Sequence, residues 1–221
     1  MNQPADVPTD VLIRTRRSLH GVAELVLAGP QYRRSGTIRL RVIDGGFVTF
    51  REPQLRVDGV ELVVGDMGYP ISGTTYADLG RLAGVDPGPP EGLYRGGSGV
   101  QLDEIAEVDP AATRWITQSL HTGVLAMREL AVHEQPVLWP EHFDVGITLD
   151  EVNYGVSPGD DYRQEPYAYV GPWKQREGGF WNAPFGAFRP MRDVATPEAL
   201  FAFFAEGRAR AGQDPVDPRL S

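Results

Sequence analysis

The chain has 221 residues, of which 41% are hydrophobic and 23% charged, so it is long enough to bury a core without disulfide staples. The absence of cysteine excludes disulfides, thiolate metal sites and thiol catalysis. The formal net charge is -9, and such an acidic field repels phosphate backbones. Nucleic acid is therefore not an expected partner unless a local basic patch exists.

The first residues carry no targeting signal. The stretch MNQPADVPTD contains neither a basic nor an apolar segment, and no apolar run approaches the ~20 residues that span a bilayer. We therefore expect a cytoplasmic protein without a membrane partner, whose residues 1–8 are frayed.

The first predicted element is a helix from Val11 to Ala28. Thr9 or Asp10 can cap its start, and Ala28-Gly29-Pro30 predicts its end. Its apolar face, at helical spacing, consists of Leu12, Leu19, Val22 and Val26.

Residues 37–64 predict an antiparallel meander of two hairpins. Apolar and polar residues alternate over residues 37–42, and the turns are Asp44-Gly45-Gly46 and Asp58-Gly59. A short helix over residues 76–83 completes a first half, residues 1–83.

Residues 84–108, rich in Gly and Pro at their start, predict a linker or loop to a second half, residues 109–211. There, Asp109-Pro110 begins a helix that ends near Leu130. Strands are predicted from His142 to Leu149, at NYGV and at PYAYV. Thr196-Pro197 begins a last helix, and residues 212–221 are expected to be a disordered tail.

Strands that come in runs, rather than alternating with helices, favour an α+β fold. We expect antiparallel sheets of hairpins packed against two long helices and a C-terminal helix, within one compact domain.

A cluster of scarce residue types between residues 139 and 182 marks the candidate ligand site. This segment contains three of the four tryptophans, half of the tyrosines and two of the three asparagines. Aromatic walls with a few polar anchors are typical of small-molecule pockets, although an aromatic core is the alternative. The predicted ligand-binding residues are Trp139, His142, Asp144, Asn153, Tyr154, Glu165, Tyr167, Tyr169, Trp173 and Asn182.

His142 and Asp144 form the first pair within that segment. Two-residue spacing on a strand directs both side chains to one face, ~6.5–7 Å apart at the backbone. That distance suits metal ligation or a histidine oriented by a carboxylate, but a merely polar strand face gives the same pattern.

A divalent metal is the cofactor that the sequence suggests. His20 and Glu24 lie four residues apart on one helix face, and His121 and His142 could complete a site. A second set of oxygen ligands is Asp144, Asp160, Asp161 and Glu165. A solvated helix face and a solvated loop are the alternatives.

No nucleotide-binding or nucleophile-elbow motif is present. The GGSG run at residues 96–99 has no strand before it, so it is a poor phosphate cradle.

Five sequence blocks carry a family resemblance: WPEHFD at residue 139, NYG at 153, SPGD at 157, EPY at 165 and YVGPW at 169, in a chain whose only lysine is Lys174. With this spacing, residues 138–185 resemble an uncharacterised family of actinobacterial-type proteins from high-GC genomes. The resemblance implies no activity and no catalytic residue.

The leading prediction is a small-molecule-binding protein with a pocket built from residues 139–182, anchored by His142, Asp144, Asn153 and Glu165. One alternative is a metal-dependent hydrolase or isomerase that uses histidine and carboxylate ligands. The other is a homodimeric interaction module that associates through the phenylalanines of the C-terminal helix.

Overall fold

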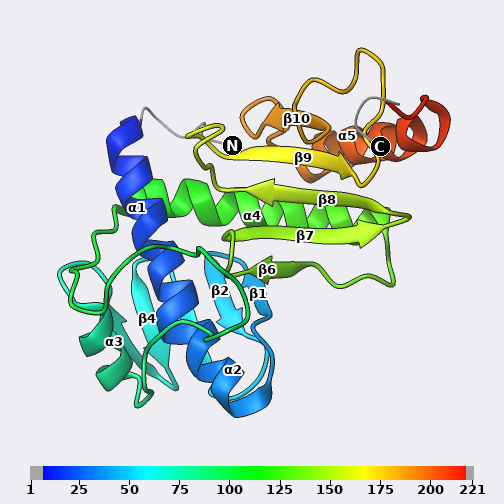
Figure 1. Cartoon of the computed structure of the whole chain (residues 1–221). Coiled ribbons are helices and arrows are strands. Elements are labelled where there is room, and N and C mark those ends of the chain that lie inside the picture. Colours follow the sequence, from blue (N-terminus) through cyan, green and yellow to red (C-terminus); the bar gives the residue numbers. More distant parts are fainter. Residues whose placement is uncertain (1–6, 218–221) are drawn as a thin grey trace. The chain divides into compact units, whose positions relative to one another are not determined.

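The computed structural model describes residues 7–217, which form two compact units (Figure 1). The first unit contains the chain as far as Gln118 together with Val137–Phe143. The second contains Ser119–Pro136 together with the chain from Asp144 onward. Helices accompany antiparallel strands in both, which confirms the predicted α+β class. No helix within residues 7–217 is long and apolar enough to cross a bilayer.

The first unit begins with three helical segments in one continuous run. They are α1 (Thr9–Gly21), the π-helix η1 (Val22–Ala28) and α2 (Gly29–Ser35). The predicted end at Gly29-Pro30 is therefore wrong, and the predicted side-chain cap at the start is not formed. The run ends instead at Gly36, whose φ of 73° is the left-handed conformation typical of a helix C-terminus.

The π-helix explains how the run passes through Pro30. In the wider turn the Gly29 N–H donates to the Glu24 carbonyl, five residues back. The carbonyl of Leu25 would accept from residue 30 in the same register, but proline has no N–H. The Gly88 N–H donates to that carbonyl instead, at 2.8 Å. The loop that contains Gly88 therefore completes the helix.

Six strands form the sheet of the first unit, in the order β6-β1-β2-β3-β4-β5. Their bounds are β1 (Leu40–Ile43), β2 (Gly46–Thr49), β3 (Leu55–Asp58), β4 (Glu61–Val64), β5 (Met67–Pro70) and β6 (Val137–Trp139). The predicted hairpins are confirmed by antiparallel pairs from β1 to β4. Strands β5 and β6 were not predicted, because each is short and lacks a clean alternation.

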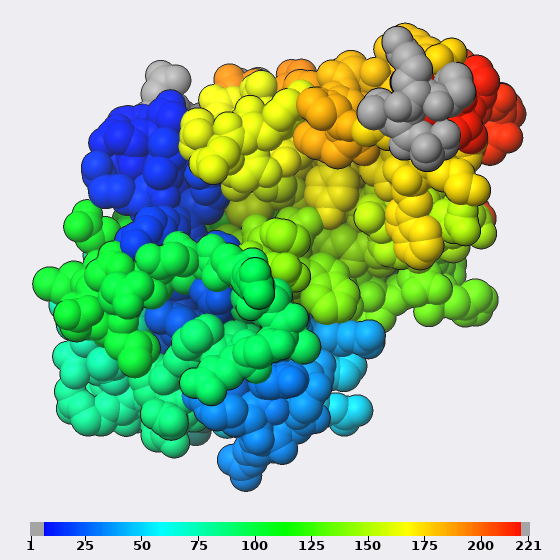
Figure 2. Space-filling view, viewed as in Figure 1, coloured from blue at the N-terminus to red at the C-terminus, as the bar shows by residue number. Residues whose placement is uncertain are grey.

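Helix α3 (Tyr76–Leu82) confirms the predicted short helix, and Thr75 caps it by accepting from the Asp78 N–H at 3.1 Å. Residues 84–108 then run back over η1 inside the first unit, so they are a loop. Figures 1 and 2 show this segment, teal to green, covering much of the blue helical run.

Helix α4 (Pro110–Leu130) leads from the first unit into the second. It begins where the sequence predicts, since the Asp109 carboxylate accepts from the Ala111 and Ala112 N–H groups at 2.9 Å each.

The second unit has a four-stranded antiparallel sheet, in the order β7-β8-β9-β10. Its elements are β7 (Asp144–Leu149), β8 (Val152–Ser157), β9 (Tyr167–Pro172), β10 (Ala187–Pro190) and α5 (Pro197–Gln213). Strand β10 was not predicted.

Both helices of the second unit pack on one face of its sheet. A Cβ added to Gly123 of α4 would lie 2.7 Å from the Val156 side chain, and one added to Gly207 of α5 would lie 2.7 Å from Val170. Val156 and Val170 point to the same side of the sheet. Val170 pairs with Tyr154, which lies two residues before Val156 on β8, and residues two apart on a strand share a side. Neither α4 nor α5 lies on the opposite face, as Figure 1 shows for β7 and β8 in front of α4.

Two predictions about chain segments are corrected. The strand does not begin at His142, because Phe143 has a φ of 56° and its N–H bonds back to the Trp139 carbonyl in a turn. The predicted disordered tail is wrong for residues 212–217, where α5 continues to Gln213 and Val216 forms a bridge with Arg176. Residues 1–6 and 218–221 lie outside the described residues.

Candidate functional site

The helix-free face of the second unit's sheet gathers half of the predicted ligand-binding residues. Because strand side chains alternate, residues two apart share a face, and the antiparallel register aligns them across strands. We call this surface the tyrosine face. It carries Asp144, Thr148, Asn153, Tyr167 and Tyr169.

Tyr169 lies flat across two glycines of that face. A Cβ added to Gly155 would be 2.4 Å from the phenol ring, and one added to Gly146 would be 3.3 Å from the hydroxyl oxygen. The hydroxyl donates a hydrogen bond to the Asp144 carboxylate. Burial raises the pKa of the Tyr169 phenol, and the neighbouring Asp144 charge raises it further. The phenol therefore stays protonated and remains a donor.

A second phenol–carboxylate pair lies beside the first. The Tyr167 hydroxyl donates to Asp160 Oδ2 at 2.6 Å, and burial followed by this hydrogen bond raises the pKa of Tyr167. Asp160 is itself oriented, since Oδ1 accepts from the backbone N–H groups of Tyr162 and Arg163 at 2.9 and 3.0 Å. The aromatic rings around these pairs contact one another edge to face or stacked. They belong to Tyr162, Tyr167, Tyr169, Phe185 and Phe188.

Asn153 and Trp173 extend the tyrosine face. Asn153 Oδ1 accepts from the Thr148 hydroxyl at 2.8 Å and lies 3.4 Å from the Trp173 indole nitrogen. Trp173 is 65% exposed. An exposed tryptophan beside an amide is a ring that a ligand can stack on.

Other predicted ligand residues do not contribute to this face. Tyr154 points to the opposite side, where it is fully buried against Phe204. Glu165 accepts from Arg163 at 3.2 Å and from Arg192 at 2.5 Å. Asn182 accepts from the Phe188 N–H at 2.9 Å. Tyr154 is thus a core residue, whereas Glu165 and Asn182 hold surrounding chain in place.

The remaining two, Trp139 and His142, belong to the first unit. His142 is exposed, with Nε2 3.8 Å from Glu141. The turn at Phe143 separates it from strand β7, so the predicted shared strand face of His142 and Asp144 is wrong.

A second candidate site, which we call the Glu24 centre, lies in the first unit and consists of His20, Glu24, Tyr94 and Ser98. Glu24 is only 3% exposed, on η1. Its carboxylate accepts from the Ser98 N–H at 2.8 Å, the Ser98 hydroxyl at 2.6 Å and the Tyr94 hydroxyl at 3.1 Å. A buried charge is tolerated only with such partners. Burial, then the Glu24 charge, raises the pKa of Tyr94.

The run Gly96–Gly99 supplies this cradle. Gly97 has a φ of 91°, and a Cβ there would lie 2.0 Å from Glu24 Oε1, so only glycine fits. The sequence indicated a loop here but not its ligand, which is a carboxylate of the protein rather than a phosphate. The cluster of glycines was the only signal available.

His20 lies one turn before Glu24 on the same helical run. Its Nε2 is 2.7 Å from the Pro140 carbonyl, and its ring stacks on Phe143 with centroids 5.4 Å apart. A carbonyl only accepts, so Nε2 carries the proton and Nδ1 is the unprotonated nitrogen of the neutral ring. Burial lowers the pKa of His20, and the Pro140 carbonyl and Glu24 oppose that effect only in part. The structure therefore favours a neutral imidazole.

The predicted metal site gains no structural support. Among residues 7–217, no three His, Cys, Asp or Glu side chains form a group that could hold a metal ion. His20, Glu24 and His142 belong to the first unit, and His121 lies in the α4 segment of the second. The metal site stays a prediction.

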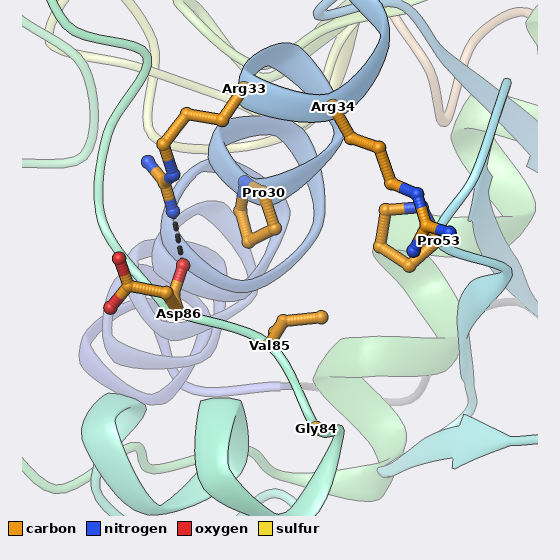
Figure 3. Close-up of a pocket in the computed structure, with 7 residues that line it drawn as sticks. All are labelled: Pro30, Arg33, Arg34, Pro53, Gly84, Val85 and Asp86. Atoms are coloured by element: carbon orange, nitrogen blue, oxygen red, sulfur yellow. Dashed lines mark hydrogen bonds between the residues drawn. The ribbon is translucent and has the colours of Figure 1, made fainter.

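A pocket of about 280 Å³ opens beside α2 in the first unit (Figure 3). Arg33 and Arg34 flank Pro30 on one side, and Figure 3 shows the Arg33 guanidinium directed at the Asp86 carbonyl, to which it donates. The full lining is Pro30, Arg33, Arg34, Pro53, Gly84, Val85 and Asp86.

Comparison of the chain with protein-family models, with curated proteins and with solved structures gave no match. The function must therefore be inferred from the geometry of these sites.

Proposed function

We propose that the tyrosine face binds a small, neutral ring compound that carries hydroxyl groups. The observation that supports this is the pair of phenol–carboxylate hydrogen bonds, Tyr169 to Asp144 and Tyr167 to Asp160, on a face that no helix covers. The proposal takes the protein to be a small-molecule-binding protein of the cytoplasm.

The chemistry of the face favours ligand donors over ligand anions. Carboxylate, amide and phenol oxygens are all acceptors, and a phenol that donates to a carboxylate keeps its own lone pairs for a ligand hydroxyl. The nearby cations are already engaged, since Arg163 and Arg192 both donate to Glu165. An anionic ligand would meet the charges of Asp144 and Asp160, whereas Arg163 and Arg192 are already engaged by Glu165.

The aromatic rings favour a ligand with a flat or cyclic body. Trp173 is exposed, and Phe185 contacts both Tyr167 and Tyr169. A ring that stacks on these side chains removes apolar surface from water while its hydroxyls reach the acceptors.

The proposal is tested by isothermal titration calorimetry and ligand-observed NMR with neutral monosaccharides and cyclic polyols, each matched with its acidic or phosphorylated analogue. We expect neutral compounds to bind, and their anionic analogues to bind at least about tenfold more weakly, a difference of about 1.4 kcal/mol.

Two matched variants make the test specific. Tyr169→Phe removes the phenol on the tyrosine face, and we expect it to weaken binding about tenfold, as the loss of one hydrogen bond near a charge predicts. Tyr154→Phe makes the same chemical change on the opposite face and should leave affinity unchanged. Equal affinity of both variants, or no binding by any compound of the panel, would rule out this site.

A further inference from the structure

One buried glutamine forms hydrogen bonds with the backbone of Arg39 and of Arg51, which lie in separate segments of the first unit. Gln31 is fully buried on α2, and its Nε2 donates to the Thr37 and Arg39 carbonyls at 2.9 and 3.0 Å. Its Oε1 accepts from the Arg51 N–H at 2.6 Å. Helix α2 is thereby attached both to the chain before β1 and to the chain after β2. We call the resulting surface the arginine face. It consists of Arg39, Arg41 and Arg51 with the rings of Phe50 and Trp139.

The guanidinium groups of this face stack on aromatic rings. Arg39 lies 5.9 Å from the Trp139 ring centroid. Arg41 and Arg51 lie 5.7 and 5.3 Å from that of Phe50. Cation–π stacking holds the planar group over a ring and leaves its N–H edge available.

These arginines lack the carboxylate partners that other arginines of the unit have. Arg14, Arg17 and Arg81 form ion pairs with Asp10, Glu104 and Asp78 at 2.9, 2.6 and 2.5 Å. By contrast, no side chain of residues 7–217 forms an ion pair with Arg39, Arg41 or Arg51. Unpaired cations concentrated on one face of a chain with net charge -9 favour an anionic partner.

The pocket of Figure 3 holds two further arginines of the first unit. Pro53, two residues after Arg51, forms one wall, and Arg33 and Arg34 line the other. Arg33 is held by the Asp86 carbonyl and, at 3.4 Å, by that of Pro89. The acidic residues nearby are Glu52, beside Arg51 in sequence, Asp86 in the pocket lining, and Asp58, which pairs with Arg56 on the same side of the sheet as Arg41.

We infer that the arginine face binds single-stranded nucleic acid. Phosphates would contact the N–H edges of the guanidinium groups. Arg39 and Arg41 lie two residues apart, so their backbone positions are ~6.5–7 Å apart along an extended chain, and each can contact its own phosphate. Bases would stack on the outer planes of the guanidinium groups that lie over Phe50 and Trp139. An acidic peptide would satisfy the charges but would leave these planes unused, and a duplex hides the faces of its bases. The expectation from net charge allowed this exception, a local basic patch.

The test is fluorescence anisotropy with labelled 12-nucleotide oligo-U and oligo-dT at 50 mM salt. A duplex of the same length and a labelled polyglutamate serve as competing classes of polyanion. We expect the single strands to bind and both other probes to bind at least tenfold more weakly. Equal or tighter binding of polyglutamate or of the duplex, or no binding of either single strand, would overturn the inference.

Arg39→Ala combined with Arg41→Ala should weaken binding at least tenfold and reduce the slope of log K against log salt by about 1.4, the value for two lost single-strand phosphate contacts. Phe50→Leu should weaken binding several-fold without changing that slope, because the guanidinium charges remain while the ring that holds their planes for stacking is lost. The control is Arg14→Ala with Arg81→Ala, which changes net charge equally in the same unit and should retain wild-type affinity. An equal loss in that control would show that overall charge, not this face, is responsible.

Discussion

Tyrosine hydroxyls donate to carboxylates in both units, but the carboxylate is buried in the first unit and partly exposed in the second. Tyr94 reaches Glu24 beneath the loop over η1, where Glu24 is 3% exposed and Ser98 supplies two further donors. Tyr169 reaches Asp144 on a sheet face that no helix covers, and Asp144 is partly exposed. The comparison teaches that a tyrosine–carboxylate hydrogen bond can either hold a loop in place or orient polar groups on an open surface. Burial decides which, because a buried carboxylate without its donors is costly.

The largest expected effect on stability comes from neutralising the carboxylates of Glu24 and Asp144, each in a separate variant. Glu24→Gln replaces an acceptor by an NH₂ group that faces the donors of Ser98 and Tyr94, so we expect a loss of about 3 kcal/mol in the free energy of unfolding. Asp144→Asn should cost about 1 kcal/mol or less, because water can replace the lost acceptor. Urea denaturation measures both, and similar losses would contradict the distinction between a closed and an open site.

Two glycines of the loop at residues 96–99 test how closely that loop must approach Glu24. Gly97→Ala introduces a Cβ only 2.0 Å from Glu24 Oε1, whereas Gly99→Ala meets nothing within 4 Å. Both positions have positive φ, 91° and 66°, so both variants carry backbone strain of about 1 kcal/mol. We expect Gly97→Ala to lose at least about 1 kcal/mol more than Gly99→Ala in thermal unfolding. Equal losses would mean that the loop does not need its close approach to Glu24.

Acid should affect the Glu24 centre through His20. The pKa of His20 is lowered, chiefly by burial, with His142 and Arg16 lowering it further and Glu24 opposing. A depressed pKa contributes stability above the unfolded value of about 6.5, and that stability is lost as pH falls, because only the unfolded state gains the proton readily. Wild-type protein should therefore lose up to about 1.4 kcal/mol per pH unit below pH 6.5 relative to His20→Gln. Parallel pH profiles of the two proteins would refute this.

The smallest expected effect separates the two faces of the second unit's sheet. The Tyr154 hydroxyl is buried and has no hydrogen-bond partner among the described residues, so Tyr154→Phe should raise stability at pH 7 by about 1 kcal/mol. Burial raises the pKa of Tyr154 to about 12. Wild type therefore loses stability as pH rises from about 10 towards 12, and the advantage of the variant should grow there. A destabilised variant would mean that the hydroxyl has a partner in solution.

Local chemistry made much of the fold predictable. Asp58-Gly59 predicted its hairpin, and Asp109-Pro110 predicted the start of α4, because turns and caps depend on a few adjacent residues. The spacing of Tyr167 and Tyr169 likewise predicted a shared face, since a strand has a period of two. The same rule failed for His142 and Asp144, because Phe143 adopts the left-handed conformation, which resets the alternation, and its ring packs against His20 and Phe47.

By itself, the sequence determined the α+β class, the hairpins from β1 to β4, the start of α4, and the shared side of β9 on which the two tyrosines lie. Those features depend on neighbours within a few residues. Only the tertiary structure decided that a loop 70 residues away would fasten Glu24, that Tyr154 would face the core, and that arginines from β1 and the segment after β2 would stack on one ring. These depend on which distant segments meet, and a linear pattern does not record that.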